Sequence, residues 1–568
     1  MRKLLPVFML AVLTGCTGSA ATPTPNPQTP TNATNTNTSN GASSSGTNDK
    51  GSATTTEVKQ DKPAASKPAY QKERLEEPPA VSVNVSALAA PPKGLAEAPK
   101  TCKAFVTRKP AAAPACKTRD EALAALDKAL SESSPDKRDA QLAGLEKCEG
   151  LPAGMTRALR AEMAPLECGD ALVEPLVSSP PAGIDGAMYA TLRGLATASR
   201  IARTGSSAPK LAPPFERKKV EEFIAGPMKE WMSSQAVAIE ELSKEGLKLT
   251  SYARGIAAIE AGMAELRIVE AVRGAPVPAE FAKDTERANV YYAQLDQVLD
   301  PRKDRGRDAT LVGLRDLGQA GVLHDARIDR ARSLLSRLYG GRRIDALDAL
   351  LFPALSKAEA TTVQDRLAQK LPTFYAGILL PREGTKQAAF MRALLERGVP
   401  LGHRIALQDG ELAPDIRRLY ARARLEFGRT YLRAVDFDQT LALLAAIPES
   451  ERTDEDKLIF ALAEALRNGP EDAAVMVRNA PVPMLGMGDV KSLDALSTAQ
   501  QKGPLAGFAA FDAALVKQIT APIGADAAYF RDIATRYRAA AGQLAEANHK
   551  KAAEERAKSA EATAAAIH

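Results

Sequence analysis

Apolar residues recur at helical spacing over most of the chain from about residue 118 onward, and this periodicity constrains the fold more than any other feature. The clearest example is 251–273, where one apolar stripe recurs at alternating steps of four and three: Tyr252, Ile256, Ile259, Met263 and Leu266. Small residues that would let two partner helices approach closely flank this stripe: Ala253, Ala257, Ala258, Ala261 and Gly262. Gly274 is placed to end the helix. The pattern predicts an all-α body.

Capping signals indicate where other helices begin. Thr118 and Glu121 have the spacing of a capping box, and Ser134-Pro135 is typical of an N-cap followed by the first helical residue. Further starts carry signals of the same kind: Ser356 with Glu359, Pro414, and Thr453. Other helices are expected near 155–167, 187–203 and 215–245.

The helix expected over 215–245 contains the pair Gly226-Pro227. Proline removes a backbone N–H donor and clashes with the preceding turn, so this pair should kink or split the helix. Trp231, the only tryptophan, follows the break among apolar residues. We expect Trp231 in the core rather than in a ligand platform.

Residues 17 to about 79 consist of Thr, Asn, Ser, Pro, Gly and Ala with almost no large apolar side chains. Such a segment cannot bury enough surface to offset the entropy of ordering it, so we expect a long disordered linker. Residues 80–86 then alternate between apolar and polar types. We expect extended linker there, and the alternative is a strand that adds to the sheet edge of another protein.

Residues 1–15 have the layout of a secretory signal, with a basic start, a short apolar run and small residues at its end: Arg2, Lys3, Leu4–Leu13 and Thr14-Gly15. The apolar run is about half of the ~20 residues that a membrane-spanning helix requires. Cys16 follows the small pair directly, and the segment resembles the lipobox of bacterial lipoproteins.

This resemblance implies that residues 1–15 are removed and that Cys16 carries acyl chains such as palmitate. Several acyl chains on one cysteine give a stable anchor where a single chain would not. Thr17, and not Asp, follows Cys16, which resembles the sorting signal for the outer membrane. The implied location is the outer membrane, with the lipid-anchored body on the periplasmic side.

Apart from Cys16, the cysteines all fall within one stretch: Cys102, Cys116, Cys148 and Cys168. An even number in an exported chain predicts disulfides, and four cysteines allow three connectivities. We expect Cys102–Cys116 and Cys148–Cys168, because short loops close first. A metal site is the alternative, although the chain has no C-x-x-C motif and the nearest histidine is His324.

The formal net charge is +6, and both signs are interspersed along the chain. Residues 301–343 are locally basic, but aspartates lie between the arginines, so we expect an ion-paired helix surface, with a groove for an anionic partner as the alternative. Aromatic residues make up 5%, too few for base-stacking platforms. The sequence therefore gives no indication of nucleic-acid binding.

Within residues 421–454, Gly428 is followed three positions later by Tyr431, then by Phe437 and Leu444. This order of small, aromatic and leucine positions resembles a tetratricopeptide repeat. The resemblance implies a helical hairpin in which the glycine allows close approach and the two aromatic rings fill the space between the helices.

The segment departs from that pattern at Thr440, where a small alanine is usual, and at Pro448, which comes early. A single repeat cannot bury its own face, so neighbouring hairpins must stack on it. We expect an α-solenoid or stacked helical hairpins, and a generic helical bundle is the alternative.

These features suggest a division of the chain into six parts. They are a signal peptide (1–15), the lipidated cysteine with a disordered spacer (16–100), a small disulfide-stapled helical subdomain (101–180), a helical bundle (181–345), the helical-hairpin region (346–541) and a polar tail (542–568).

The sequence nominates no catalytic residue, metal ligand or cofactor site. The four histidines are far apart: His324, His403, His549 and His568. The chain has no H-E-x-x-H, G-x-S-x-G or phosphate-loop motif. We therefore expect an envelope scaffold or assembly factor that binds a protein partner without a catalytic step. One alternative is a peptidoglycan- or polysaccharide-acting hydrolase with a buried carboxylate of raised pKa in a cleft, and another is a small-solute carrier.

Overall fold

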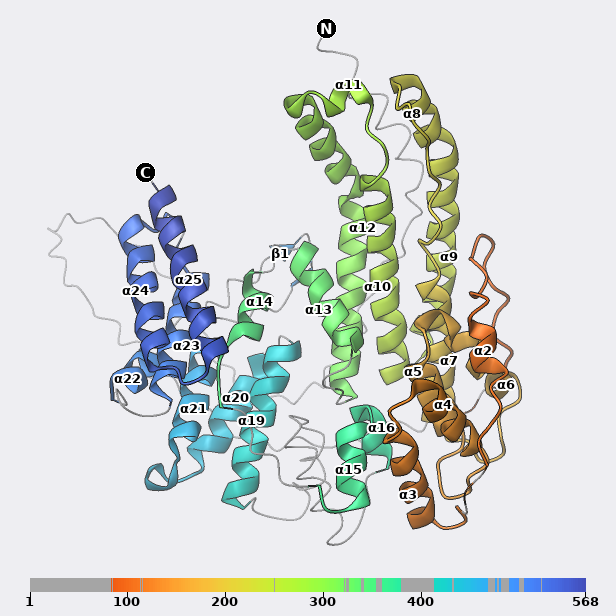
Figure 1. Cartoon of the computed structure of the whole chain (residues 1–568), viewed down its shortest axis with the longest axis horizontal. Helices are drawn as coiled ribbons and strands as arrows, with labels where there is room; N and C mark the ends of the chain where they lie inside the picture. The colour runs from red at the N-terminus through yellow and green to blue at the C-terminus, as the bar shows by residue number, and fades with distance from the viewer. Residues whose placement is uncertain are drawn as a thin grey trace, which may run out of the picture.

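The computed structural model describes residues 83, 85–112, 114, 116–249, 251–320, 322, 326–338, 342–353, 360–379, 413–431, 434–467, 476–477, 480–481, 490–499, 505–522 and 524–567. Within these ranges every element is a helix except one short antiparallel pair, β1 (Met476–Val477) and β2 (Ala480–Pro481). The expected all-α class is confirmed. In Figure 1 the helices cross the molecule broadly in chain order, from α2 on one side to α25 on the other.

The first helices are short: α2 (Cys102–Val106), α3 (Arg119–Leu130), α4 (Pro135–Gly144), α5 (Met155–Met163), η2 (Leu166–Cys168) and α6 (Gly169–Ser178). The capping box before α3 is confirmed, since the Thr118 hydroxyl accepts from the Glu121 N–H and the Glu121 carboxylate accepts from the Thr118 N–H. Ser134 and Pro135 occupy the N-cap and the first turn of α4, as expected.

The four cysteines form two disulfides, but the expected pairing was wrong. Cys102 pairs with Cys168 and Cys116 with Cys148, with Cα–Cα distances of 5.1 and 5.5 Å. The reason is that α2 packs against η2 and α6, which brings Cys102 to the far end of the cysteine-containing stretch.

The next three helical segments follow one another along one side of the molecule. They are α7 (Gly186–Ala202), then α8 (Arg217–Phe223), which runs through the π-helical turn η3 (Ile224–Met228) into α9 (Lys229–Leu247). The expected disturbance at Gly226-Pro227 therefore takes the form of a π turn within a continuing helix. Trp231 is half-buried against the apolar residues there, and its indole N–H donates to the Ser206 carbonyl at 3.2 Å.

Helix α10 (Ser251–Arg273) has the bounds that its apolar stripe predicted. It packs against α7 on one side and against α12 (Thr285–Gln319) on another, so the expectation of two partner helices is confirmed. Small residues permit both contacts. A Cβ on Gly194 of α7 would lie 2.7 Å from the Ala253 Cα, and one on Gly262 would lie 2.2 Å from the Thr310 Oγ1 of α12.

The short helix α11 (Ala279–Ala282) lies between α10 and α12 in the chain. Four further helices follow α12: α13 (Ala326–Leu338), α14 (Arg342–Ala349), α15 (Val363–Lys370) and α16 (Thr373–Ile378). Helix α15 returns to α3, where Arg366 and Lys370 pair with Asp127 at 2.9 and 2.6 Å. The capping box expected at Ser356 and Glu359 lies outside the described residues. The box before α15 is formed by Thr362 and Asp365.

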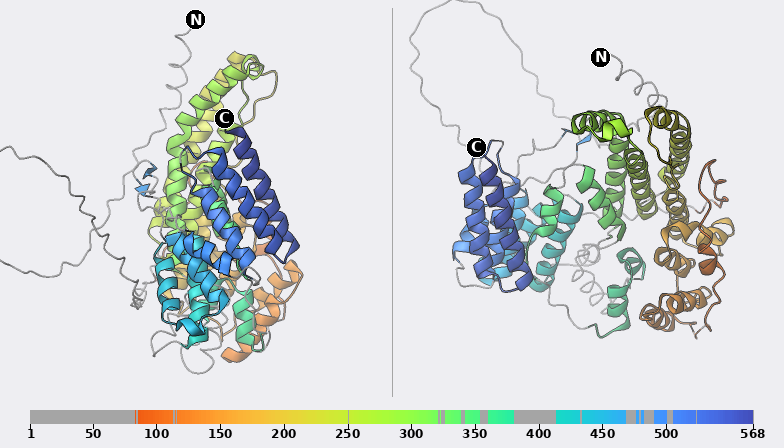
Figure 2. Two further views of the ribbon diagram at one scale, coloured as in Figure 1. Left: turned by 90° about the vertical axis from the view of Figure 1, so that its left-hand side faces the viewer. Right: turned by 45° about the horizontal axis from the view of Figure 1, so that its top comes forward.

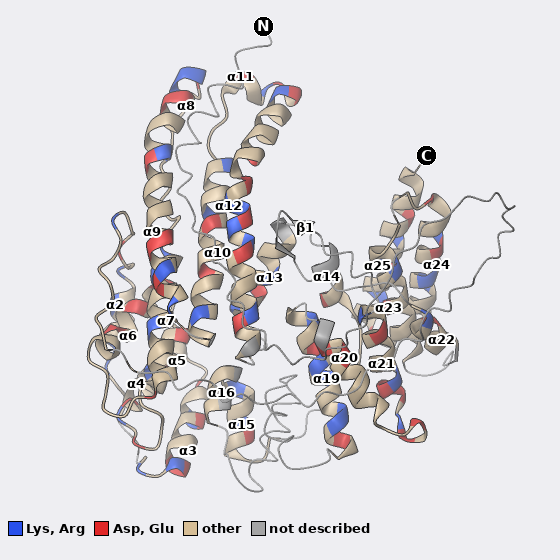
Figure 3. Cartoon of the chain, turned by 180° about the vertical axis from the view of Figure 1, so that it is seen from behind, with Lys and Arg blue, Asp and Glu red and all other residues tan. Residues whose placement is uncertain are grey.

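The basic stretch 301–343 is ion-paired in its described part. Arg302 pairs with Glu265 at 2.8 Å and Arg330 with Glu260 at 2.6 Å, so its arginines meet acids of the neighbouring α10. Figure 3 shows the same mixture of signs along α9, α10 and α12. The expected ion pairing is confirmed, but both acids are buried, so these contacts lie between packed helices and not on a solvent-exposed surface.

The C-terminal part of the chain, from residue 414 onward, is a stack of consecutive helices: α19 (Pro414–Tyr431), α20 (Ala434–Ala445), η4 (Glu449–Glu451), α21 (Asp454–Arg467), α22 (Lys491–Ala499), α23 (Ala506–Ile519), α24 (Ala527–Gln543) and α25 (Ala547–Ala566). From α19 onward each α-helix packs on the next one in the chain. The two views of Figure 2 show this arrangement of stacked hairpins. Helices begin at Pro414 and after Thr453, as expected, and the Thr453 hydroxyl accepts from the Asp456 N–H at 3.1 Å.

The last stretch, 542–568, was expected to be a polar helix or tail, and the structure shows helix α25 over Ala547–Ala566. Helix α25 packs along α24 through alanines at steps of four, three and four: Ala553, Ala557, Ala560 and Ala564. Because the alanine side chains are small, the two helices can lie close together along this face.

Two large apolar cores account for most of the packing. The first joins residues of α3, α5, α6, α7, α10, α12, α13, α15 and α16, together with Phe427 and Tyr431 of α19. The second joins α14 to helices α19–α25. A smaller cluster lies between α9, α10 and α12. Because the first core draws residues from 122 to 431, the division into the 101–180, 181–345 and 346–541 segments stays a prediction.

Residues 85–97, which we call the strap, fall within the segment expected to be spacer. The structure places them against α7 and α9, where side chains of both helices donate to strap carbonyls. Most of the period-two segment 80–86 lies outside the described residues, and Val85 and Ser86 belong to no strand.

Candidate functional site

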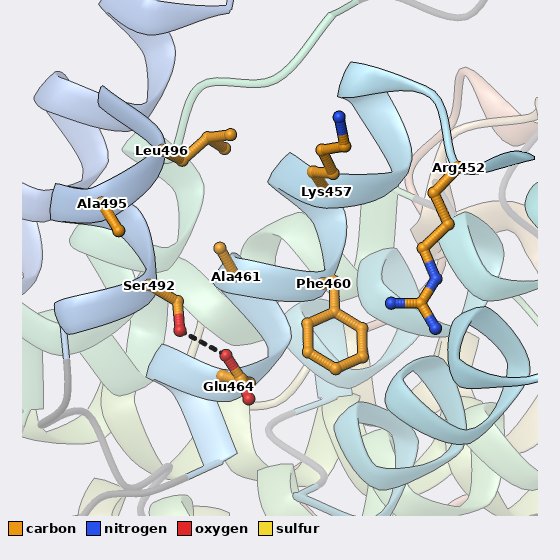
Figure 4. A pocket seen from close by; sticks show the side chains of 8 residues that line it. All are labelled: Arg452, Lys457, Phe460, Ala461, Glu464, Ser492, Ala495 and Leu496. Atoms are coloured by element: carbon orange, nitrogen blue, oxygen red, sulfur yellow. Dashed lines mark hydrogen bonds between the residues drawn. The ribbon is translucent and has the colours of Figure 1, made fainter. Parts of the chain in front are cut away.

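A pocket of about 370 Å³ opens to solvent between α21 and α22. Its lining comes from these two helices and the turn before α21: Arg452, Lys457, Phe460, Ala461, Glu464, Ser492, Ala495 and Leu496. In Figure 4 the two basic side chains lie toward one side of the pocket, and Glu464 and Ser492 lie toward the other. The pocket therefore has polar ends of different charge.

At the basic end, two contacts hold the Arg452 side chain in place. Its Nε donates to the Ile447 carbonyl at 3.0 Å, and its guanidinium carbon lies 5.5 Å from the centre of the Phe460 ring. Lys457 is exposed and lies 3.2 Å from Asp454, its neighbour one turn earlier on α21. An exposed ion pair of this kind contributes little stability, so the ammonium group can exchange its partner for a ligand.

The opposite end joins the two helices directly. The Ser492 hydroxyl on α22 donates to the Glu464 carboxylate on α21. Ala461 and Leu496 are buried and form the apolar floor, while Phe460 is half-buried and leaves part of its ring accessible. The pocket thus combines a cationic end, an apolar floor and a carboxylate–hydroxyl end.

The buried carboxylates with raised pKa lie elsewhere. Burial raises the pKa of Glu260 on α10, although Arg330 and Arg327 oppose the shift. Burial likewise raises the pKa of Asp512 on α23 well above its ordinary value. Both side chains are buried between packed helices, and neither lines the pocket.

The structure separates the residues of the tetratricopeptide-like pattern. Phe437 and Leu444 are buried in the second core. Tyr431 lies in the first core, where its hydroxyl donates to the Val322 carbonyl and its ring faces Gly318 of α12. The two aromatic rings therefore do not share one space between α19 and α20, because α19 is packed on both sides.

Gly428 is buried within α19. The departure at Thr440 has a local reason. Its buried hydroxyl lies 3.1 Å from the Ala421 carbonyl of α19 and 2.8 Å from the Asp436 carbonyl in its own helix. A hydroxyl therefore bridges the two helices at the position where an alanine methyl is usual.

Cys16 lies outside the described residues, so its lipidation stays a prediction. Three of the histidines, His324, His403 and His568, also lie outside them. His549 packs edge-on against Phe508. Among the residues that the structure describes, His, Cys, Asp and Glu side chains form no group of three or more that could hold a metal ion.

Sequence reasoning missed the pocket. Lys457, Phe460 and Glu464 are spaced along one face of α21 at steps of three and four, so part of the signal was present. The contribution of Ser492 and Leu496 depends on how α22 docks, and no local pattern specifies that contact.

None of the helices in the described part of the chain combines the length and the apolar character needed to cross a bilayer. No family model matches the chain, and no curated protein or solved structure matches it either.

Proposed function

We propose that this protein is a lipid-anchored envelope lipoprotein that binds a protein partner on its C-terminal helical stack and performs no catalytic step. The anchor is argued from the lipobox-like sequence that ends at Cys16. The disulfides of the N-terminal helices are in keeping with an oxidising compartment.

The observation that carries the binding proposal is the open pocket between α21 and α22. It lies on a stack of consecutive helices, an architecture that presents extended surfaces to partners. Its accessible ring, Phe460, beside an exposed ammonium group, Lys457, provides an aromatic anchor with a charged neighbour.

The test is photo-crosslinking in intact cells from a probe placed at Ala495, an exposed lining residue. We expect one reproducible protein adduct, and we expect Lys457→Glu to abolish it. The matched control is Lys551→Glu, which reverses an exposed charge on α25 away from the pocket and should leave the adduct unchanged.

An adduct that persists in Lys457→Glu would remove the pocket from the proposal. Recovery of cell-wall or polysaccharide fragments in place of a protein would favour the hydrolase or carrier alternative.

A further inference from the structure

The strap is held to the body through its main chain. The Arg193 guanidinium donates to the Ser86 carbonyl at 2.8 Å, and Arg200 donates to the Ala89 carbonyl at 2.5 Å. Further along, Gln235 donates to the Gly94 carbonyl and Arg203 to the Ala96 carbonyl, both at 3.0 Å. Residue numbers increase along the strap in the same order as those of its partners on α7. The strap therefore runs parallel to α7.

The apolar contribution to this contact is shallow. Pro92 is buried, but Leu88 and Leu95 are only partly buried at the edges of the first and third clusters, and most other strap residues are exposed. Segments with few buried apolar contacts open at the lowest free energy in a protein. The strap should therefore detach before any of the packed helices.

The body keeps its own ionic contacts when the strap leaves. Arg203 also pairs with Asp170 of α6 at 2.8 Å and donates to the Glu167 carbonyl. Arg200 lies 3.5 Å from the same Asp170. After release, both of these buried guanidinium groups still have an acidic neighbour. Release therefore does not leave an unpaired buried charge, which would oppose it.

A covalent stop follows the strap. Cys102, a few residues beyond the last strap contact, is joined to Cys168 between η2 and α6. A pull from the N-terminal side can peel the strap only as far as this disulfide. Beyond it the load passes into the body.

We propose that the strap is a force-releasable connector, which detaches from α7 and α9 under tension from the N-terminal side and lengthens the tether reversibly while the body stays folded. The biological source of the tension rests on the lipid anchor of the proposed function. Release of 85–101 adds at most about 60 Å of extended chain. The tether thus has a second, longer state that is reached without unfolding a helix.

The experiment is single-molecule pulling of the full-length Cys16→Ser chain between handles at its two termini. We expect a small reversible extension of no more than about 60 Å before the main unfolding. Arg193→Ala removes a charged donor at the rim of α7 and should raise the rate of this step at fixed force about tenfold. The matched control is Arg217→Ala, an exposed arginine of α8 paired with Glu221, which should leave the rate unchanged.

A trace without an Arg193-sensitive step ahead of the main unfolding would overturn the proposal, and so would an equal response to Arg217→Ala. The measurement needs no lipid. Its failure is therefore distinguishable from failure of the anchor, which is read from membrane fractionation.

Discussion

The Tyr252 hydroxyl on α10 donates a 2.6 Å hydrogen bond to the Glu162 carboxylate on α5. The same carboxylate oxygen accepts from the Tyr375 hydroxyl of α16 at 3.0 Å, and the other pairs with Arg327 of α13 at 2.5 Å. Burial raises the pKa of Tyr375 well above its ordinary value, so this hydroxyl remains a neutral donor at physiological pH. One carboxylate therefore connects four helices that are distant in sequence.

Replacement of Glu162 by alanine should destabilise the protein by about 3 kcal/mol, because it removes the carboxylate that pairs with the buried Arg327 guanidinium and accepts from two buried tyrosine hydroxyls. Denaturant unfolding, followed by circular dichroism, measures the change. Glu240→Ala, which removes an exposed carboxylate on α9, is the matched control and should leave the midpoint unchanged. A midpoint for Glu162→Ala equal to that of the control would show that the four-helix contact is energetically unimportant.

Local signals were enough to predict several of the elements. The capping box at Thr118, the bounds of α10 and the small residues that bring two helices to it all depend on residues a few positions apart. The pairing of Cys102 with Cys168 depends instead on how α2 docks, and a preference for short loops gave the wrong answer.

Three other features lacked a sequence signal for a physical reason. The strap is recognised through its carbonyl groups, which every residue possesses, so its composition still indicated spacer. The buried face of α25 consists of alanines such as Ala553 and Ala557, which carry little hydrophobic contrast. The pocket needs Ser492 to meet Glu464 across two helices, and that contact is tertiary.

Gly262→Ala should destabilise the α10–α12 contact by about 1–3 kcal/mol. The added Cβ would lie 2.2 Å from the Thr310 Oγ1 and 2.6 Å from the Gly306 carbonyl oxygen, so the helices must separate. Gly542→Ala in α24 is the matched control, because a Cβ there meets no atom within 4 Å. It should stabilise by roughly 0.5–1 kcal/mol through helix propensity. Thermal unfolding of the two variants in parallel measures whether each one raises or lowers the unfolding temperature. Equal shifts in that temperature would contradict the close approach of α10 and α12.

Peptide mapping of the unreduced protein should recover Cys102 linked to Cys168 and Cys116 linked to Cys148. Since the first pair closes a sequence separation of 66, replacing both of its cysteines by serine should cost about 4 kcal/mol by the loop-entropy relation. Peptides linking Cys102 to Cys116 would contradict the packing of α2 on α6.

Cys16→Ser should move the protein from the membrane fraction to the soluble fraction, because the acyl chains are the proposed attachment. Immunoblotting of fractionated cells measures the distribution. Thr17→Ser, next to the proposed lipidation site, is the control and should stay with the membrane. Retention of Cys16→Ser in membranes would refute the lipid anchor.

Asp512 provides a pH-dependent prediction. Its Oδ1 accepts from the Leu351 N–H at 2.8 Å, which ties the segment after α14 to α23, whereas Oδ2 has no hydrogen-bond partner among the described residues. Burial raises the pKa of this carboxyl well above its ordinary value, so the folded state holds its proton at a pH where the unfolded state has lost it. Its contribution to stability is therefore complete below about pH 4, and it falls as the pH rises toward the raised pKa.

Asp512→Asn keeps the shape and the acceptor but cannot ionise, so the variant should gain stability relative to the wild type as the pH rises above about 4. The difference between the two proteins is the quantity to measure, by denaturant unfolding at a series of pH values. Asp170 and Asp532, whose pKa values are lowered by hydrogen bonds and ion pairs that outweigh burial, add stability over that pH range in both proteins and cancel in the difference. A difference that does not change with pH would mean that Asp512 ionises normally and that its site admits water.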